Sequence, residues 1–228
     1  MKYLFFLILL FSSVYAQQAK ILYTAALLEN NFETRKQEYI HSINILKEFG
    51  YKPYIVESCN KSGPTFFDEY SSHVCYAGTN DPTLRNKGVN EVLSLLAAFG
   101  EYDFNDDDMI IKLTGRYFFE NDLFLKFVEK NKKYDAIVSR DTRRQIFDRD
   151  IVPIVFTGCF AMKYKYLKRM LEQLDLEKME RNIDKILERE VTKYLFSFVQ
   201  KGGTVVYLDK LHLTANIAFP GQDRLTHW

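Results

Sequence analysis

Alternating apolar and polar stretches along the chain predict an α/β fold with a mostly parallel sheet. Ile21–Leu28 carries almost no charge and Tyr54–Glu57 is apolar up to its last residue, as in strands buried within a sheet. Between them, apolar residues at helical spacing predict an amphipathic helix over 33–49 that stops at Gly50. A strand, a helix and a strand of this size form a βαβ unit with a right-handed crossover, so the two strands are expected to be parallel.

The strand Met109–Leu113 is predicted to lie at the centre of the sheet. An acidic run, Asp106–Asp108, precedes this strand, and Thr114-Gly115-Arg116-Tyr117 follows it. Ligands of open α/β sheets bind at the carboxyl ends of the strands. A hydroxyl, a guanidinium and a phenol beside a glycine therefore indicate a binding site there. The acidic run precedes the strand, at the opposite edge, and we interpret it as a solvated turn.

The rest of the pattern predicts one domain with helices on both faces of the sheet. Residues 58–80 are expected to form a long loop with a short helical or strand piece near Phe66–Tyr70 or His73–Tyr76. Asp81 followed by proline is typical of a helix start, which predicts a helix over 82–99. Further helices are expected over 122–131, 164–174 and 177–200, and strands over 134–139, 151–156 and 205–208, before a C-terminal tail.

The N-terminal residues have the composition of a secretion signal. Lys2 precedes an apolar core, Tyr3–Val14, and a small-residue cleavage site ends at Ala16. The core is shorter than the ~20 residues of a spanning helix, so we expect a cleaved signal peptide over 1–16 and a mature domain over 17–228. A cleaved signal implies the secretory pathway, the periplasm or the extracellular space; a retained signal-anchor, the alternative, implies a membrane-tethered domain. No later stretch is apolar enough to span a membrane.

Composition narrows the classes of function and partner. With 47% hydrophobic and 15% aromatic residues, the chain has ample apolar surface for a core. The net charge is +1, from 31 Lys and Arg against 30 Asp and Glu, so no general attraction to nucleic acid is expected. The three cysteines are too few and too irregularly spaced for a zinc site. Cys59 and Cys75 could pair in an oxidising compartment and leave Cys159 buried.

Several catalytic signatures are absent from the sequence. It contains no Gly-x-Gly-x-x-Gly, no Walker-type phosphate loop, no Gly-x-Ser-x-Gly and no His-Glu-x-x-His, which argues against a dehydrogenase, a P-loop enzyme, an α/β serine hydrolase or a zinc protease. Polar groups at strand ends remain, and these ends share one edge of a parallel sheet. They fit a nucleotide-diphosphate ligand and comprise Thr24, Glu57, Thr114 to Tyr117, Asp141 and Thr157-Gly158.

The order of elements over about residues 20–200 resembles the GT-A class of glycosyltransferases, nucleotide-sugar-dependent enzymes with one Rossmann-like sheet. The stretch 112–117, Lys-Leu-Thr-Gly-Arg-Tyr, is similar to a strand-end motif of poorly characterised glycosyltransferase-like proteins of polysaccharide synthesis. The other matching features are the opening βαβ unit with Glu57, Arg85-Asn86-Lys87-Gly88, and Phe156-Thr157-Gly158.

This resemblance implies a nucleotide-sugar donor and a glycan, lipid or protein acceptor. The nucleotide-sugar-binding residues that it implies are Thr24, Glu57, Arg85, Lys87, Gly88, Thr114, Gly115, Arg116 and Tyr117, with Thr24 and Glu57 near the nucleoside. Thr157 and Gly158 would lie on the acceptor side. For Gly88, a packing reason and a ligand-approach reason both fit the sequence.

The chain departs from the GT-A pattern at the metal site. GT-A enzymes usually carry Asp-x-Asp at the end of the central strand, where it holds a divalent metal such as Mn or Mg, and this chain has Thr114-Gly115-Arg116 there. Either Arg116 grips the diphosphate directly through its planar fork and the reaction is metal-independent, or the domain has lost catalysis and only binds carbohydrate or protein. An Arg116 that pairs structurally with the neighbouring Asp run is a third alternative.

An inverting transfer needs a carboxylate that takes the proton from the acceptor hydroxyl. Asp141, Glu188 and Glu190 are the candidates. Asp141 belongs to a charged stretch, 140–150, which fits either a solvated loop or an active-site lid. Glu190 also fits an exposed helix carboxylate paired with Lys193, and a retaining mechanism stays open.

Overall fold

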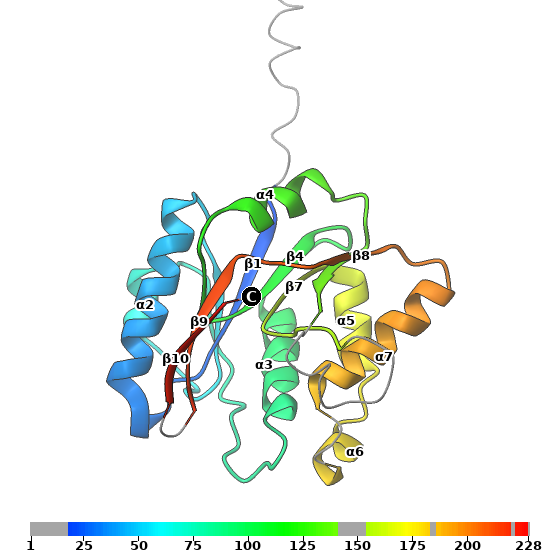
Figure 1. The fold of residues 1–228 in the computed structure, drawn as a ribbon. Coiled ribbons are helices and arrows are strands. Elements are labelled where there is room, and N and C mark those ends of the chain that lie inside the picture. The colour runs from blue at the N-terminus through cyan, green and yellow to red at the C-terminus, as the bar shows by residue number, and fades with distance from the viewer. Residues whose placement is uncertain (1–17, 141–153, 183–185, 220–221, 228) are drawn as a thin grey trace, which may run out of the picture.

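The computed structural model describes residues 18–140, 154–182, 186–219 and 222–227. These residues form an α/β fold around a seven-stranded sheet with the strand order β3-β2-β1-β4-β7-β6-β8 (Figure 1). The expected signal peptide over 1–16, the residue Asp141 and the first half of the predicted strand 151–156 lie outside the described residues.

The sheet is mostly parallel and β4 is its central strand, as the sequence predicts. β1 pairs in parallel with both β2 and β4, β2 with β3, and β6 with β8. β7 runs antiparallel between β4 and β6, in a stretch where the sequence pattern predicted no strand. The strands are β1 (Lys20–Ala25), β2 (Tyr54–Glu57), β3 (Val74–Tyr76), β4 (Met109–Thr114), β6 (Ala136–Ser139), β7 (Cys159–Lys163) and β8 (Val205–Leu208).

Helices cover both faces of the sheet and enclose two apolar cores. Alternation along β4 sends Ile111 and Leu113 into one core and Ile110 into the other, because successive side chains of a strand point to opposite faces. None of the helices in the described ranges is both long enough and apolar enough to cross a membrane. α2 (Phe32–Glu48) and α4 (Leu123–Lys130) pack on one face, and α3 (Lys87–Glu101), α5 (Tyr164–Glu172), α6 (Leu176–Arg181) and α7 (Leu187–Gln200) pack on the other.

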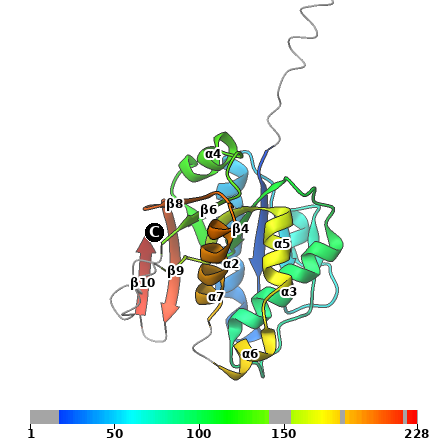
Figure 2. The same ribbon diagram turned by 90° about the vertical axis from the view of Figure 1, so that its right-hand side faces the viewer.

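A second, three-stranded sheet forms where the sequence predicted a C-terminal tail. β9 (Leu213–Phe219) and β10 (Gln222–His227) make an antiparallel hairpin, and β9 pairs antiparallel with β5 (Tyr117–Phe119). Leu213 and Ala215 are buried in the core shared with α2 and α4. The hairpin therefore lies on the α2 side, away from α3 and α5, as Figure 2 shows.

The crossover helix α3 starts later than the sequence predicts. Asp81 does not cap it, because the Asp81 carboxylate accepts hydrogen bonds from the backbone nitrogen (2.8 Å) and the hydroxyl (2.6 Å) of Thr83 and closes a turn. Asn86 caps the helix instead, with its side-chain oxygen 3.0 Å from the backbone nitrogen of Gly88. Gly88 therefore lies in the first turn, and the helix continues through Gly100.

The helical pattern over 177–200 forms two helices rather than one. Asp175 caps α6, and Asn182 at the end of α6 is extended. α7 begins after Ile186, which is extended too. The apolar stripe of the sequence persists across the break because α6 and α7 contribute to the same core.

The acidic run lies at the amino edge of the sheet, but it is not simply a solvated turn. Asp108 is buried and forms an ion pair with Lys20 at 2.6 Å. Asp107 is exposed and pairs with Lys165 at 2.7 Å. The run therefore fastens the start of β4 to β1 and to α5.

The suggested disulfide between Cys59 and Cys75 is wrong, since all three cysteines are free thiols. Cys75 is buried in β3, whereas Cys59 lies half-buried in the loop after β2. One short piece was expected at either of two positions in that loop, and the structure has an element at both, a 3-10 helix over Phe66–Glu69 and strand β3.

Candidate functional site

The chain reverses its direction of travel across the sheet between β1 and β4. From β1 it passes through α2 to β2 and β3 on one side, and through α3 it returns to β4 on the other side of β1. The carboxyl ends of β1 and β4 therefore form a topological switch point, with α2 on one face and α3 on the other. Figure 1 shows the two strands side by side. Ligands of open α/β sheets bind outside such a point.

Two threonines mark the switch point. Thr24 and Thr114 are register partners at the last rung of the β1–β4 pairing, and both are partly exposed. The Thr24 hydroxyl makes no hydrogen bond to any residue that the structure describes. It is therefore available to a ligand, and the expected contact of Thr24 with a nucleoside stays a prediction.

Beside Thr114 lies a buried lysine. The Lys112 ammonium donates hydrogen bonds to the Thr114 hydroxyl and to the Thr157 carbonyl, each at 2.7 Å, and forms an ion pair with Glu91 of α3. Thr114 in turn donates to Glu91 at 3.3 Å. A buried ammonium needs such partners because an isolated buried charge is very costly. We call Thr24, Glu91, Lys112, Thr114 and Thr157 the switch-point cluster.

Sequence reasoning missed Lys112 and Glu91 as members of this site. Lys112 is the one charged residue in the strand Met-Ile-Ile-Lys-Leu-Thr, and lysines are almost never fully buried unless they are paired. The strand pattern therefore indicated a partner on the facing helix. It could not identify that partner, because the register between α3 and β4 is set by tertiary packing.

Glu57 lies at the expected edge, at the end of β2, but its carboxylate is occupied by hydrogen bonds from backbone nitrogens. One of its oxygens accepts hydrogen bonds from the backbone nitrogens of Leu27 and Cys59, each at 2.9 Å. The other accepts from the backbone nitrogen of Asn60 at 2.6 Å. Glu57 is completely buried. It therefore joins the loops after β1 and β2, and it can affect a nucleoside only by positioning those loops.

Arg116 follows β4 at the carboxyl edge of the sheet, on the face covered by α2. Burial raises the pKa of Glu38 in α2, and the charges of Arg35 and Arg116 act in the opposite direction. Arg116 is partly exposed and forms no ion pair with the residues described. The alternative that it pairs with the run 106–108 is wrong, because that run contacts lysines at the opposite edge. Arg116 thus keeps its charge available near the switch point.

Gly115 and Tyr117 have packing roles. A Cβ on Gly115 would lie 2.7 Å from the Tyr23 ring and 2.8 Å from the Tyr39 ring. The Gly115 carbonyl accepts a hydrogen bond from the Tyr23 hydroxyl at 2.6 Å. Tyr117 is buried, with its ring edge-to-face against Phe156 at 5.3 Å between centroids. Packing alone therefore accounts for both residue types.

Gly88 and Gly158 are also explained by packing. A Cβ on Gly88 would lie 3.0 Å from the Cβ of Leu187 in α7. A Cβ on Gly158 would lie 2.9 Å from the Tyr117 ring. The Gly158 carbonyl accepts a hydrogen bond from the backbone nitrogen of Thr114 at 2.8 Å, so Gly158 adjoins the switch-point cluster.

The residues expected near the donor phosphates precede and begin α3. There the Glu180 carboxylate of α6 accepts hydrogen bonds from the backbone nitrogens of Arg85 at 2.7 Å and Asn86 at 3.1 Å. These bonds lower the pKa of Glu180. The Lys87 ammonium is 3.4 Å from the Pro82 carbonyl. A carboxylate of the chain itself therefore already occupies the backbone donors that a phosphate would use.

Of the expected catalytic carboxylates, the structure describes Glu188 and Glu190. Glu190 forms an ion pair with Lys193 on the same helix at 2.8 Å, which is the alternative that the sequence allowed. Glu188 lies in the same first turn of α7. Asp141 lies outside the described residues.

The described residues at this edge do not fit a divalent metal ion. Thr114-Gly115-Arg116 stands at the end of β4, and the nearby carboxylates Glu57 and Glu91 are engaged by backbone nitrogens and by Lys112. Within the described ranges, no three His, Cys, Asp or Glu side chains are grouped to hold a metal ion. Positive charge for a diphosphate can come from Arg116.

Comparisons with known proteins find similar solved structures, and three of them are glycosyltransferases. No family model and no curated protein sequence matches the chain. A glycosyltransferase involved in the glycosylation of the major capsid of PBCV-1 has 10% identity and a TM-score of 0.46, with 83% of this chain and 82% of that chain covered. The galactosyltransferase LgtC, in complex with donor and acceptor sugar analogs, has 13% identity and a TM-score of 0.47, with 82% and 72% covered.

A third similar structure is the apo-form glycosyltransferase GlyE of Streptococcus pneumoniae TIGR4. Its identity is 9% and its TM-score is 0.46. The matched region covers 83% of this chain and 45% of that chain. At such identities and TM-scores the likeness concerns the arrangement of strands and helices alone, and it assigns no role to a residue.

Proposed function

We propose that the chain is a glycosyltransferase that binds a nucleotide-activated sugar at the switch point between β1 and β4 and transfers the sugar to a glycan, lipid or protein acceptor. One observation carries this proposal. The Thr24 hydroxyl, which makes no hydrogen bond to a described residue, lies beside Thr114, at the position where open α/β sheets bind their ligands. The GT-A-like order of elements in the sequence points to the same class of ligand.

Arg116 would supply the charge that stabilises the leaving diphosphate. A guanidinium stays charged and can hold two phosphate oxygens at once. Such stabilisation of developing charge is often the largest single contribution to catalysis. The partial exposure of Arg116 and its lack of an ion pair with described residues support this role. On this account the transfer is metal-independent.

Lys112 would act as a positioning residue. Its side chain is 1% exposed, so it does not contact a ligand at the surface. Its hydrogen bonds to Thr114 and Thr157 tie the end of β4 to the segment before β7. Thr157, which is expected on the acceptor side, is thereby held against the end of β4, where the sugar donor is proposed to bind.

A second function, ligand binding without transfer, is favoured by the state of the described carboxylates. Glu57 accepts three backbone hydrogen bonds, and Glu190 pairs with Lys193. Neither is poised to take a proton from an acceptor hydroxyl. Within this proposal, Asp141 would have to be the base of an active enzyme.

A panel of nucleotide sugars separates the two functions. A bound donor should raise the thermal unfolding midpoint, because a ligand of the native state stabilises it by mass action. Mass spectrometry of the same samples should show release of the nucleoside diphosphate if the chain is an enzyme. A midpoint shift without release, retained in Asp141→Asn, would support the binding function. No shift with any donor would contradict both.

A further inference from the structure

A polar hollow lies at the opposite edge of the sheet from the switch point. Its volume is about 350 Å³, within the roughly 300–1,000 Å³ range of small-molecule sites. It opens between α5 and α7, where Asp135 precedes β6 and Gly203 precedes β8. Because β6 and β8 start here, no residue of the switch-point cluster takes part.

Three aromatic rings form one wall of this hollow. The Tyr166 and Phe198 rings lie 4.8 Å apart between centroids, and the Tyr194 and Phe198 rings stack at 5.9 Å with an interplanar angle of 12°. The Tyr194 hydroxyl donates to the Tyr166 carbonyl at 3.4 Å. Gly203 packs so closely that a Cβ there would clash with the Phe198 ring. The wall is therefore held in place before any ligand binds.

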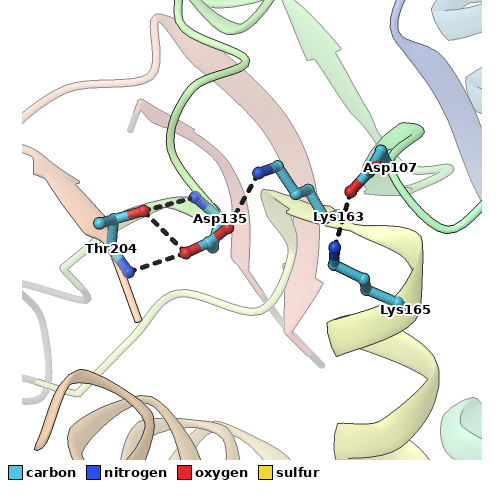
Figure 3. Close-up of polar contacts among 5 residues, drawn as sticks. All are labelled: Asp107, Asp135, Lys163, Lys165 and Thr204. Carbon is cyan, nitrogen blue, oxygen red and sulfur yellow. Dashed lines mark hydrogen bonds and ion pairs between the residues drawn. The ribbon is translucent and has the colours of Figure 1, made fainter. Parts of the chain in front are cut away.

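A fixed carboxylate also lines the hollow. Asp135 accepts hydrogen bonds from the Thr204 backbone nitrogen at 3.0 Å, the Thr204 hydroxyl at 2.8 Å and the Lys163 ammonium at 2.9 Å (Figure 3). Burial alone would raise the pKa of Asp135, but these bonds lower it. The carboxylate thus stays ionised. A carboxylate offers about four acceptor positions, so one remains for a ligand hydroxyl.

Two further polar side chains line the hollow without partners. Neither the Ser197 hydroxyl nor the Gln173 amide makes a hydrogen bond to a residue in the described part of the chain. Together with Asp135 they offer both donors and acceptors, as recognition of several hydroxyl groups requires.

The charges of the hollow favour an uncharged ligand. Arg169 lies in the last turn of α5, and Lys201 caps the carboxyl end of α7. Helix carboxyl ends carry partial negative charge that such cations offset. The Lys163 ammonium likewise offsets the negative charge of the Asp135 carboxylate. Because these charges offset one another, the hollow has little net positive charge to attract a diphosphate, which favours a neutral ligand.

We infer that this hollow binds an uncharged pyranose unit of a glycan. The apolar C–H face of the sugar would lie on the aromatic wall, whose ring faces carry negative charge density, and its hydroxyls would bond to Asp135, Gln173 and Ser197. The inference does not rest on nucleotide-sugar binding at the switch point. It adds a separate carbohydrate subsite at the amino edge of the sheet.

Ligand-observed NMR titration of the full chain tests this subsite, with methyl glycosides of common hexoses and N-acetylhexosamines as probes. At least one glycoside should bind the native protein. Ser197→Ala and Gln173→Ala, which break no internal hydrogen bond among described residues, should each weaken it roughly two- to tenfold. Tyr166→Ala should weaken it roughly tenfold or more. Phe196→Ala is the control, because Phe196 lies on α7 with 56% of its surface exposed and does not line the hollow.

Several results would overturn the inference. The first is that no glycoside binds the native protein. The others are that binding is kept in Tyr166→Ala and Ser197→Ala, or is lost equally in Phe196→Ala. Binding that is lost in Arg116→Ala but kept in Tyr166→Ala would place the sugar at the switch point instead. Circular dichroism of each variant shows whether a loss of binding reflects a loss of fold.

Discussion

The ammonium of Lys112 on β4 forms an ion pair with the carboxylate of Glu91 on α3. Lys112 is 1% exposed and Glu91 is 25% exposed, so removal of the lysine leaves a poorly solvated carboxylate. We expect Lys112→Met to lower the free energy of unfolding by about 3 kcal/mol. This is the lower end of the range for breaking a buried ion pair, because Glu91 keeps some contact with water. Urea denaturation measures this change.

The matched control is Glu91→Gln in the Lys112→Met background. Once the lysine is gone, a neutral glutamine avoids the unpaired charge and should recover part of the lost stability. If the two single substitutions add independently in the double variant, the two side chains are not coupled. The description of the switch-point cluster would then be wrong.

Glu57→Gln should destabilise the loops that follow β1 and β2. The three backbone nitrogens that donate to Glu57 would meet one oxygen and one NH₂ group, which leaves a buried donor unsatisfied at a cost of about 1–3 kcal/mol. Glu69→Gln is the control, since Glu69 is exposed and such surface changes cost about 0.5 kcal/mol or less. Equal urea midpoints for the two variants would refute the positioning role of Glu57.

Cys59 should react slowly as a thiol at neutral pH. Burial first, and then the nearby charge of Glu57, raise the pKa of Cys59 to about 11. Since the thiolate is the reactive form, alkylation by iodoacetamide should speed up by about tenfold per pH unit until the pH reaches the pKa. Mass spectrometry after unfolding without reductant should count three thiols. Fast native alkylation near neutral pH, or only one thiol after unfolding, would contradict this account.

Arg116→Ala should weaken nucleoside-diphosphate binding. Loss of a charge-assisted hydrogen bond costs ~1.5–3 kcal/mol, which is roughly a ten- to hundredfold change in the dissociation constant. Arg116→Lys should recover only part of the affinity, because an ammonium cannot reproduce the bidentate fork.

Removal of divalent metal with EDTA should leave donor binding by the native protein almost unchanged. If EDTA abolishes binding and Arg116→Ala does not, the metal-free account is wrong. An acidic residue elsewhere, with Asp141 the first to test, would then hold the ion.

Much of the fold was predictable because its signals are local. The apolar run of β4, the helical spacing over 33–49 and the polar residues at the strand ends all depend on neighbouring positions in the chain. The start of α3 was not predictable in the same way, because Asp81 and Asn86 are both good caps and only packing chose between them. The antiparallel β7 and the hairpin of β9 and β10 depend on distant pairings that short-range patterns do not encode.

In the candidate site, too, some features follow from local sequence signals and others depend on tertiary structure. Thr24, Thr114 and Arg116 lie near one edge because strand order follows from the crossover rule. The engagement of Glu57 by backbone nitrogens and of Glu190 by Lys193 depends on side-chain geometry, which residue type alone does not reveal. The sequence left packing and ligand approach both open for Gly88 and placed Gly115 and Gly158 at the binding site, and aromatic and aliphatic neighbours explain all three glycines.

The central claim, donor binding at the switch point, is tested most directly by isothermal titration of nucleotide sugars into the native protein, Thr24→Val and Ser72→Ala. Thr24→Val removes, at nearly constant shape, a hydroxyl that has no hydrogen bond to the described residues, and Ser72→Ala removes an exposed hydroxyl just before β3, at the amino edge. We predict that at least one nucleotide sugar binds, roughly two- to tenfold more weakly to Thr24→Val and equally to Ser72→Ala. No binding by the native protein, or equal affinity in all three, would contradict the claim.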